Sequence, residues 1–84
     1  MKFKAEIKVT LKDKIKDPQG LAVETVLKRI MKNTDSKIRV GKYFEIQIEA
    51  DSTNEAQKLI TSICDDVLTN PCLEKYEIIK VENL

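Results

Sequence analysis

The most informative absence in this 84-residue sequence is histidine. Without an imidazole, no serine, threonine or cysteine can be paired with the commonest general base, and zinc sites of the Cys/His type are excluded. The two cysteines, Cys64 and Cys72, have neither the spacing of a CxxC redox pair nor that of zinc ligands. We interpret both as structural thiols, and the sequence argues against a self-contained enzyme.

Glycine is almost as scarce, since only Gly20 and Gly41 are present. Two isolated glycines cannot build the phosphate-binding loops of nucleotide-binding proteins. The acidic residues are dispersed along the chain and do not resemble a metal cage. Asp65 and Asp66, for example, are on a predicted helix. We therefore expect no catalytic residue, no cofactor and no metal on this chain.

An excess of charge of either sign is also lacking. Fifteen Lys and Arg residues oppose fourteen Asp and Glu residues, for a net charge of +1, which gives no electrostatic reason to bind nucleic acid or anionic membranes. The lysine-rich N-terminal region is best interpreted as a solvated face. Because the first nine residues alternate charged and apolar side chains, they do not form a signal peptide, and we expect a cytoplasmic protein.

The chain is short enough to be a single domain, residues 1–84. A domain of this size buries only about 60 to 65% of the surface that its unfolded chain exposes, so its core is small. Association with another copy would add to that core.

Apolar and polar residues alternate strictly over residues 2–11, which predicts a strand with one solvated face. Asp17 and Pro18 then predict a helix start, with Asp17 as the cap and Pro18 in the first turn. The expected buried stripe of this helix is Leu21 or Ala22, Val23, Val26, Leu27, Ile30 and Met31. The polar run at residues 33–36 should end it.

A second helix is predicted after Ser52, which forms a capping box with Glu55. Its apolar stripe is Ala56, Leu59, Ile60, Ile63, Cys64, Val67 and Leu68, and Asn70-Pro71 should end it. Residues 75–84 form a last strand whose two halves favour opposite faces. A bulge near Ile78-Ile79 would reconcile them.

The element order is therefore βαββαβ. An antiparallel sheet with two helices on one face is the ferredoxin-like α+β arrangement, which we predict for this chain.

Residues 38–50, IRVGKYFEIQIEA, raise a conflict within that plan. Their apolar residues all occupy even positions, so a two-residue hairpin loop at Gly41-Lys42 would turn one apolar set towards water. Two interpretations stay open. Either a three-residue loop or bulge at residues 41–43 reverses the chain, or residues 38–50 are one long strand exchanged between two copies.

Several segments together resemble one known family. They are DPQG at 17–20, AVE at 22–24, RVGKYFEIQIEA at 39–50 and LTNPCLEKYEI at 68–78. In combination they closely resemble the PurS family, the small subunits of phosphoribosylformylglycinamidine (FGAM) synthase in purine biosynthesis, over nearly the whole chain.

The resemblance implies a non-catalytic subunit of an ATP- and glutamine-dependent ligase. Such a subunit would bridge a large synthetase subunit and a glutaminase subunit for ammonia transfer, as a homodimer or tetramer. The ATP and magnesium site and the glutaminase nucleophile are implied to lie on the other two chains. The alternative function is a stand-alone ferredoxin-like module that binds a small molecule or RNA.

Four residues are our candidates for contact with partner subunits: Gln19, Arg39, Lys42 and Tyr43. Arginine and tyrosine combine directional hydrogen bonds with apolar area, as interface anchors commonly do. Arg39 and Lys42 could equally be exposed strand charges, and Tyr43 could cover a sheet edge. Asp17, Pro18 and Gly20 are weaker candidates, because helix capping already accounts for Asp17 and Pro18.

Overall fold

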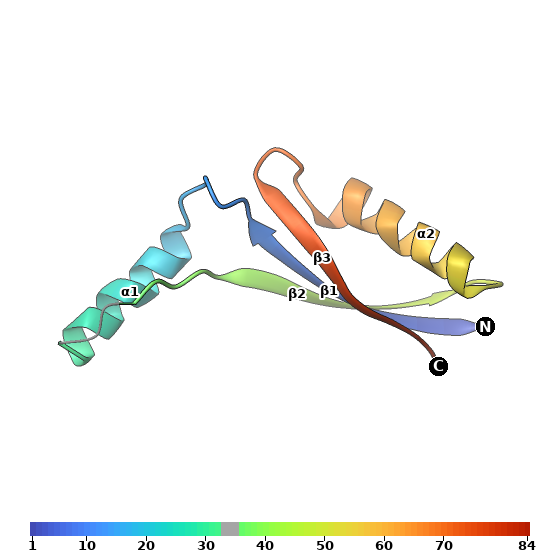
Figure 1. Cartoon of the computed structure of the whole chain (residues 1–84), viewed down its shortest axis with the longest axis horizontal. Helices are drawn as coiled ribbons and strands as arrows, with labels where there is room; N and C mark the ends of the chain where they lie inside the picture. Colours follow the sequence, from blue (N-terminus) through green and yellow to red (C-terminus); the bar gives the residue numbers. More distant parts are fainter. Residues whose placement is uncertain (33–35) are drawn as a thin grey trace.

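A three-stranded antiparallel sheet forms the centre of the molecule in this computed structural model, which describes residues 1–32 and 36–84 (Figure 1). The elements are β1 (Lys2–Leu11), α1 (Pro18–Ile30), β2 (Gly41–Glu49), α2 (Thr53–Ile63), the π-helical turn η1 (Cys64–Leu68) and β3 (Glu74–Asn83). β1 is the central strand and pairs with β2 on one side and β3 on the other. The antiparallel α+β class of the ferredoxin-like type is thereby confirmed.

Residues 36–49 do not turn back on themselves. Residues 36–40 are irregular chain that leads directly into β2, and the ladder between β1 and β2 runs without interruption from Lys2↔Glu49 to Thr10↔Gly41. The hairpin interpretation was wrong for this chain. Where two middle strands were predicted, the first is irregular chain and the second is β2. The described glycines all have negative φ, so Gly41 does not supply a left-handed turn.

Close packing of neighbouring backbone is what requires glycine at position 41. A Cβ there would lie 2.7 Å from Thr10 Cγ2 and 2.9 Å from the Val9 carbonyl oxygen. Gly41 therefore lets β2 approach the end of β1 where the two strands begin to pair.

The sheet has one apolar and one polar face, as the alternation predicts. Phe3, Ala5, Ile7 and Val9 are at most 1% exposed, and their partners on β2 include Phe44, Ile46 and Ile48. We call this the inner face. The opposite, outer face carries cross-strand ion pairs such as Lys8–Glu77 at 3.0 Å.

The bulge predicted in the last strand is present. β3 pairs with β1 through Glu6↔Lys80 and Ile7↔Ile78, which leaves Ile79 without a partner on β1. Tyr76, Ile78 and Val81 consequently all pack against the inner core, while Ile79 is 51% exposed.

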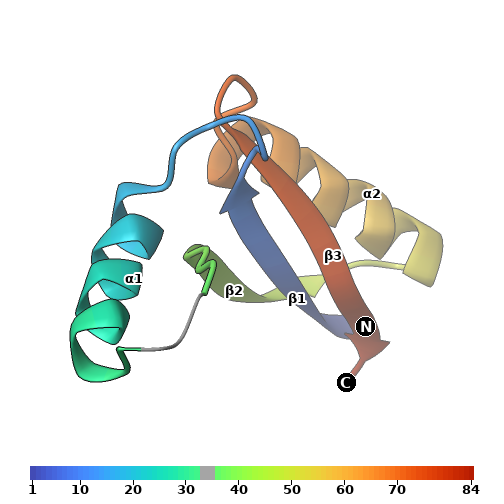
Figure 2. The ribbon, with the colours of Figure 1, turned by 60° about the vertical axis from the view of Figure 1, so that its left-hand side comes forward.

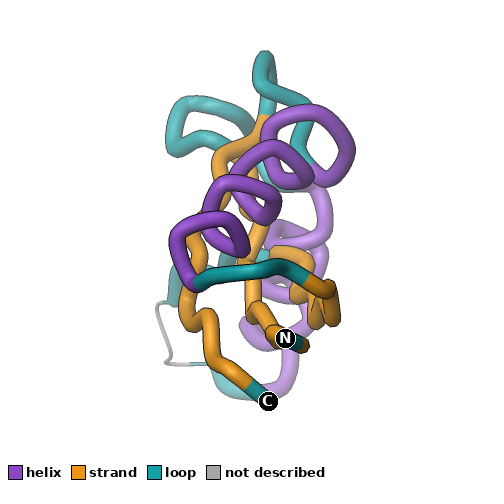
Figure 3. Tube along the Cα trace, turned by 90° about the vertical axis from the view of Figure 1, so that its right-hand side faces the viewer, coloured by secondary structure: helices purple, strands orange, loops and turns teal. Residues whose placement is uncertain are grey.

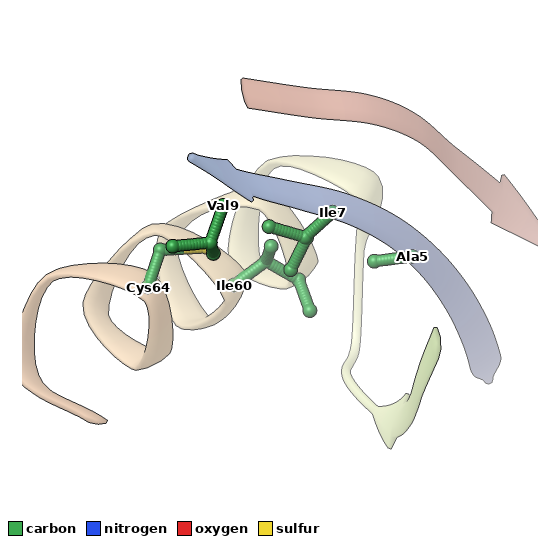
Figure 4. Close-up of a cluster of buried hydrophobic side chains, with 5 residues drawn as sticks. All are labelled: Ala5, Ile7, Val9, Ile60 and Cys64. Carbon is green, nitrogen blue, oxygen red and sulfur yellow. The ribbon is translucent and has the colours of Figure 1, made fainter. Parts of the chain in front are cut away.

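α2 covers the inner face. Its cap is Ser52, whose Oγ accepts a hydrogen bond from the Glu55 N–H at 3.1 Å. Ile60 and Cys64 meet Ala5, Ile7 and Val9 of β1 in the main core (Figure 4). Burial raises the pKa of the Cys64 thiol, whereas Cys72 is exposed, and both are free thiols. Of the predicted stripe, Leu59 and Val67 are exposed.

α1 lies away from the sheet (Figures 1 and 2). The expectation that its apolar stripe is buried was wrong for this chain, because Val23, Val26, Ile30 and Met31 are 46–73% exposed. The physical reason is the straight path of residues 36–49, which carries α1 beyond the end of the sheet. Of the predicted stop signal at residues 33–36, residues 33–35 lie outside the described residues, and the helix ends at Ile30.

The dimensions of the chain reflect this arrangement. Its principal extents are 54 × 27 × 13 Å and its radius of gyration is 16.7 Å. A compact domain of this length would have a radius of gyration of about 12 Å. We call residues 12–32 together with residues 36–40 the arm, and residues 1–11 together with residues 41–84 the body. Both termini lie at the end of the body far from α1 (Figure 1), as the view along the molecule in Figure 3 also shows.

Replacement of Ile60 by alanine should lower the free energy of unfolding by about 3 kcal/mol, because the truncated side chain leaves a cavity in a fully buried site. Urea unfolding followed by circular dichroism measures this change. Leu59→Ala is the matched control on the same helix, since Leu59 is 40% exposed and should lose less than about 1 kcal/mol. Equal losses for both variants would contradict the assignment of the core.

Candidate functional site

The two segments that carry the family-like motifs meet in the arm. Asp17, which is 5% exposed, stands at the start of α1 and contacts Val40 in the chain leading into β2. Its Oδ1 accepts a hydrogen bond from the Gly20 N–H at 2.9 Å, and its Oδ2 accepts one from the Val40 N–H at 2.7 Å. One carboxylate thus caps α1 and joins it to the strand segment.

Two more contacts join the same segments. The Ile38 N–H donates to Glu24 Oε1 at 2.6 Å. A Cβ on Gly20 would clash with the carbonyl of Ile38, so only glycine allows the helix to approach this closely. The DPQG and AVE motifs therefore have a structural role in this chain, which is to hold α1 against residues 38–40.

Arg39 binds the linker between β1 and α1. Its Nη1 donates to the Ile15 carbonyl at 3.1 Å, and its Nη2 donates to the carbonyls of Leu11 and Lys12 at 3.2 and 3.1 Å. A planar guanidinium with several fixed donors suits this arrangement in a way that a lysine does not. Arg39 is still exposed on the surface.

The other predicted contact residues lie at different places. Gln19 and Lys42 line one hollow between the start of α1 and the end of β1, and Lys42 forms an ion pair with Glu74 at 3.6 Å. Arg39 lines a second hollow together with Ile15 and Leu21. The structure therefore brings Gln19 and Lys42 together but places Arg39 in a separate hollow.

Tyr43 lies on the outer face of the sheet. Its hydroxyl donates to Glu6 Oε1 at 2.7 Å and contacts Glu45 Oε1 at 3.3 Å. The hydrogen bond to Glu6 and the neighbouring carboxylates raise the pKa of Tyr43, because they disfavour a phenolate. Tyr43 as a whole is 54% exposed.

Sequence reasoning missed the double role of Asp17 and the role of Glu24. A signal was present, because a carboxylate has two oxygens and a helix cap uses only one of them. The partner of the second oxygen comes from a segment 23 residues away, and only the folded chain shows it.

No group of three or more acidic, cysteine or histidine side chains that could hold a metal ion occurs within residues 1–32 and 36–84. Among these residues there is also no helix with the length and apolar character needed to cross a bilayer.

The fold defines a small ferredoxin-like α+β protein with a projecting helical arm. The family whose model matches is PurS, described as phosphoribosylformylglycinamidine (FGAM) synthase, and the match spans residues 4–82. The chain belongs to the PurS family of FGAM synthase subunits, as its motifs led us to expect.

Curated relatives and solved structures agree with this assignment. The chain is 32% identical to the PurS subunit of Thermotoga maritima over 90% of this chain and 93% of the relative, and 35% identical to that of Bacillus subtilis over 88% and 87%. The structure of Thermus thermophilus PurS superposes with a TM-score of 0.86 at 34% identity, covering 100% and 99% of the two chains. A chain from the structure of Thermotoga maritima PurLQS superposes with a TM-score of 0.84 at 31% identity, covering 100% and 99%.

Acid should weaken the link made by Asp17. The N–H donors of Gly20 and Val40 hold the pKa of Asp17 below its usual range, so the carboxylate contributes stability that is present above about pH 4 and is lost as the pH falls through its folded-state pKa. We expect the difference in unfolding free energy between the wild type and Asp17→Asn, measured by urea titration from about pH 7 to pH 3, to shrink below about pH 4.

Asparagine does not titrate, so this difference isolates Asp17 from the other carboxylates. A difference that stays constant over the whole pH range would contradict the described hydrogen bonds.

Proposed function

We propose that this chain is the non-catalytic small subunit of an FGAM synthase and that it bridges the synthetase and glutaminase subunits for ammonia transfer, in the cytoplasm. The observation that supports this most is the match to PurS along residues 4–82, together with the likeness to a chain of the Thermotoga maritima PurLQS structure. ATP, magnesium and the glutaminase nucleophile are assigned to the other two subunits, and no cofactor is assigned to this chain.

The shape of the chain fits a connecting role. It is 54 Å long, and its outer face carries polar side chains that no other element of the described chain covers. A rigid connector would hold the two active sites in a fixed relation, so that ammonia passes between them before it escapes to water. We assign the contacts with the partner subunits to Gln19, Arg39, Lys42 and Tyr43.

The bridging role is tested by reconstitution of FGAM synthesis from purified synthetase and glutaminase chains with and without this protein. Glutamine-dependent turnover should fall by roughly tenfold or more without it, because ammonia then diffuses away. Turnover driven by an added ammonium salt should change much less.

Equal glutamine-dependent turnover in both mixtures would overturn the bridging role. The number of glutamines hydrolysed per FGAM formed provides an independent measure, and it should rise when the protein is omitted.

We further propose that the chain associates with a second copy of itself through the arm. Among the described residues, the inner face of the sheet is covered by α2 and η1, and Phe44, Ile46 and Ile48 on β2 are only partly buried. A ferredoxin-like sheet carries two helices on this face. In the proposed dimer, the exposed α1 of one copy therefore takes the place of the second helix on the inner face of the other copy's sheet.

The backbone of the arm supports the same partner. The N–H groups of Ile38 and Val40 donate to Glu24 and Asp17 of their own chain, so this edge of the segment is already occupied. Because backbone groups of an extended segment alternate between its two edges, the other edge is free to pair with a strand. β2 is an edge strand of the sheet, and its free edge in the second copy is the partner that fits.

A charge placed in the apolar stripe of α1 should prevent this association. Val26→Asp should raise the dimer dissociation constant roughly 100-fold in sedimentation experiments, because burial of an unpaired carboxylate is strongly unfavourable. The monomer should keep its fold, since Val26 is 48% exposed in the single chain.

Thr25→Asp is the matched control, as it adds the same charge to the neighbouring, exposed position outside the stripe. Unchanged sedimentation of Val26→Asp, or equal effects of both substitutions, would contradict the proposed interface.

A further inference from the structure

The arm and the body are held together by different forces. The body has an apolar core in which α2 packs on β1. Among the described residues of the arm, Asp17 is the only non-glycine residue that is buried. The side-chain hydrogen bonds that join α1 to residues 38–40 come from two carboxylates, those of Asp17 and Glu24. The direction of α1 therefore depends on polar contacts.

We propose that the Asp17 carboxylate fixes the direction of α1 before a second copy binds, and so determines how tightly the copies associate. This inference rests on the proposed self-association. It gives Asp17 a role beyond helix capping, which is to hold α1 in the direction that the interface needs before the second copy binds.

The position of Asp17 makes this effect physically reasonable. Two chain connections link the arm to the body, one after Leu11 and one before Gly41, and the hydrogen bond between Asp17 and Val40 crosses from the first connection to the second. Without it, the described side-chain hydrogen bonds between α1 and residues 38–40 reduce to the one from the Ile38 N–H to Glu24, and the start of α1 could move relative to this segment. A second copy would then have to order the arm as it binds, which lowers affinity without removing any contact at the interface.

A second set of contacts restrains the root of the arm and does not reach α1. Asp13 forms an ion pair with Lys75 at 2.9 Å, and the Lys12 N–H donates to the Leu73 carbonyl at 2.8 Å. Arg39 holds the linker before α1 through the carbonyls of residues 11, 12 and 15. These contacts end at Ile15, so the step from the linker into α1 is fixed by Asp17.

Asp17→Asn separates the two roles of the carboxylate. Asparagine has a single acceptor oxygen, which can cap α1 as asparagine commonly does, and its amide group cannot accept from the Val40 N–H. Asp17→Ser is the second variant, because serine also caps helices but is too short to replace both oxygens. Ser52→Ala, which removes the cap of α2, is the control that leaves the arm intact.

Amide hydrogen exchange and sedimentation are measured on the full chain. In both Asp17 variants we expect exchange at Val40 to be about tenfold faster and the dimer dissociation constant about tenfold higher, in line with the loss of one hydrogen bond to a charged group. Exchange at Ile7 and Ile46 in the sheet should be unchanged, which shows that the variants are folded. Ser52→Ala should affect neither Val40 nor the dissociation constant.

Each contrary result has a definite meaning. Unchanged exchange at Val40 in both Asp17 variants would overturn the inference, and so would faster exchange with an unchanged dissociation constant. A wild-type chain that remains monomeric at all concentrations would overturn the proposed self-association and with it the role of Asp17 in association. The exchange rates would then still decide whether the carboxylate fixes the arm.

Discussion

The uninterrupted path of residues 36–49 is the constraint on which the rest of the structure depends. Because the chain does not reverse at Gly41, residues that a hairpin would place beside β2 instead continue beyond the end of the sheet. α1 precedes this segment and is joined to it by hydrogen bonds, so the helix leaves the sheet as well. In the described part of the chain, the inner face of the sheet is then covered from the α2 side only, and the apolar stripe of α1 remains exposed.

Two kinds of stabilisation operate in the two parts of the molecule. In the body, alternating apolar residues of β1 pack against Ile60 and Cys64, and burial of apolar surface stabilises the sheet and α2. In the arm, Asp17, Glu24 and Arg39 satisfy backbone donors and acceptors of segments distant in sequence. Hydrogen bonds of this kind are directional and each contributes only modest net stability, so they determine the geometry of the arm more than they drive folding.

This division fits the connecting role that we propose. In that role the chain acts through the surfaces it presents and the distances it fixes. The outer face, the arm and the two hollows that contain Gln19, Lys42 and Arg39 are such surfaces. The Tyr43 hydroxyl, held by Glu6, adds an oriented aromatic ring to the outer face.

Local rules were sufficient to predict β1, the starts of α1 and α2, and β3 with its bulge, but not the π-helical turn η1 or the path of residues 38–50. Strict alternation identified β1, Asp17-Pro18 and Ser52 identified the helix starts, and the conflicting halves of residues 75–84 identified the bulge at Ile79. These signals act over a few residues, so a single sequence contains them. The site was predicted less completely, because its four candidates are distributed over three places and Asp17 was assigned only half of its contacts.

What the sequence by itself determined is where β1, α1, α2 and β3 form and which face of β1 is apolar. Only the tertiary structure decided whether residues 38–50 bend or continue, and therefore where α1 lies. The physical reason is that both paths place the even-numbered apolar residues on the same face and satisfy the same local rules. Their difference lies in contacts such as Val40 with Asp17 and Gly41 with Thr10, which join residues more than twenty positions apart.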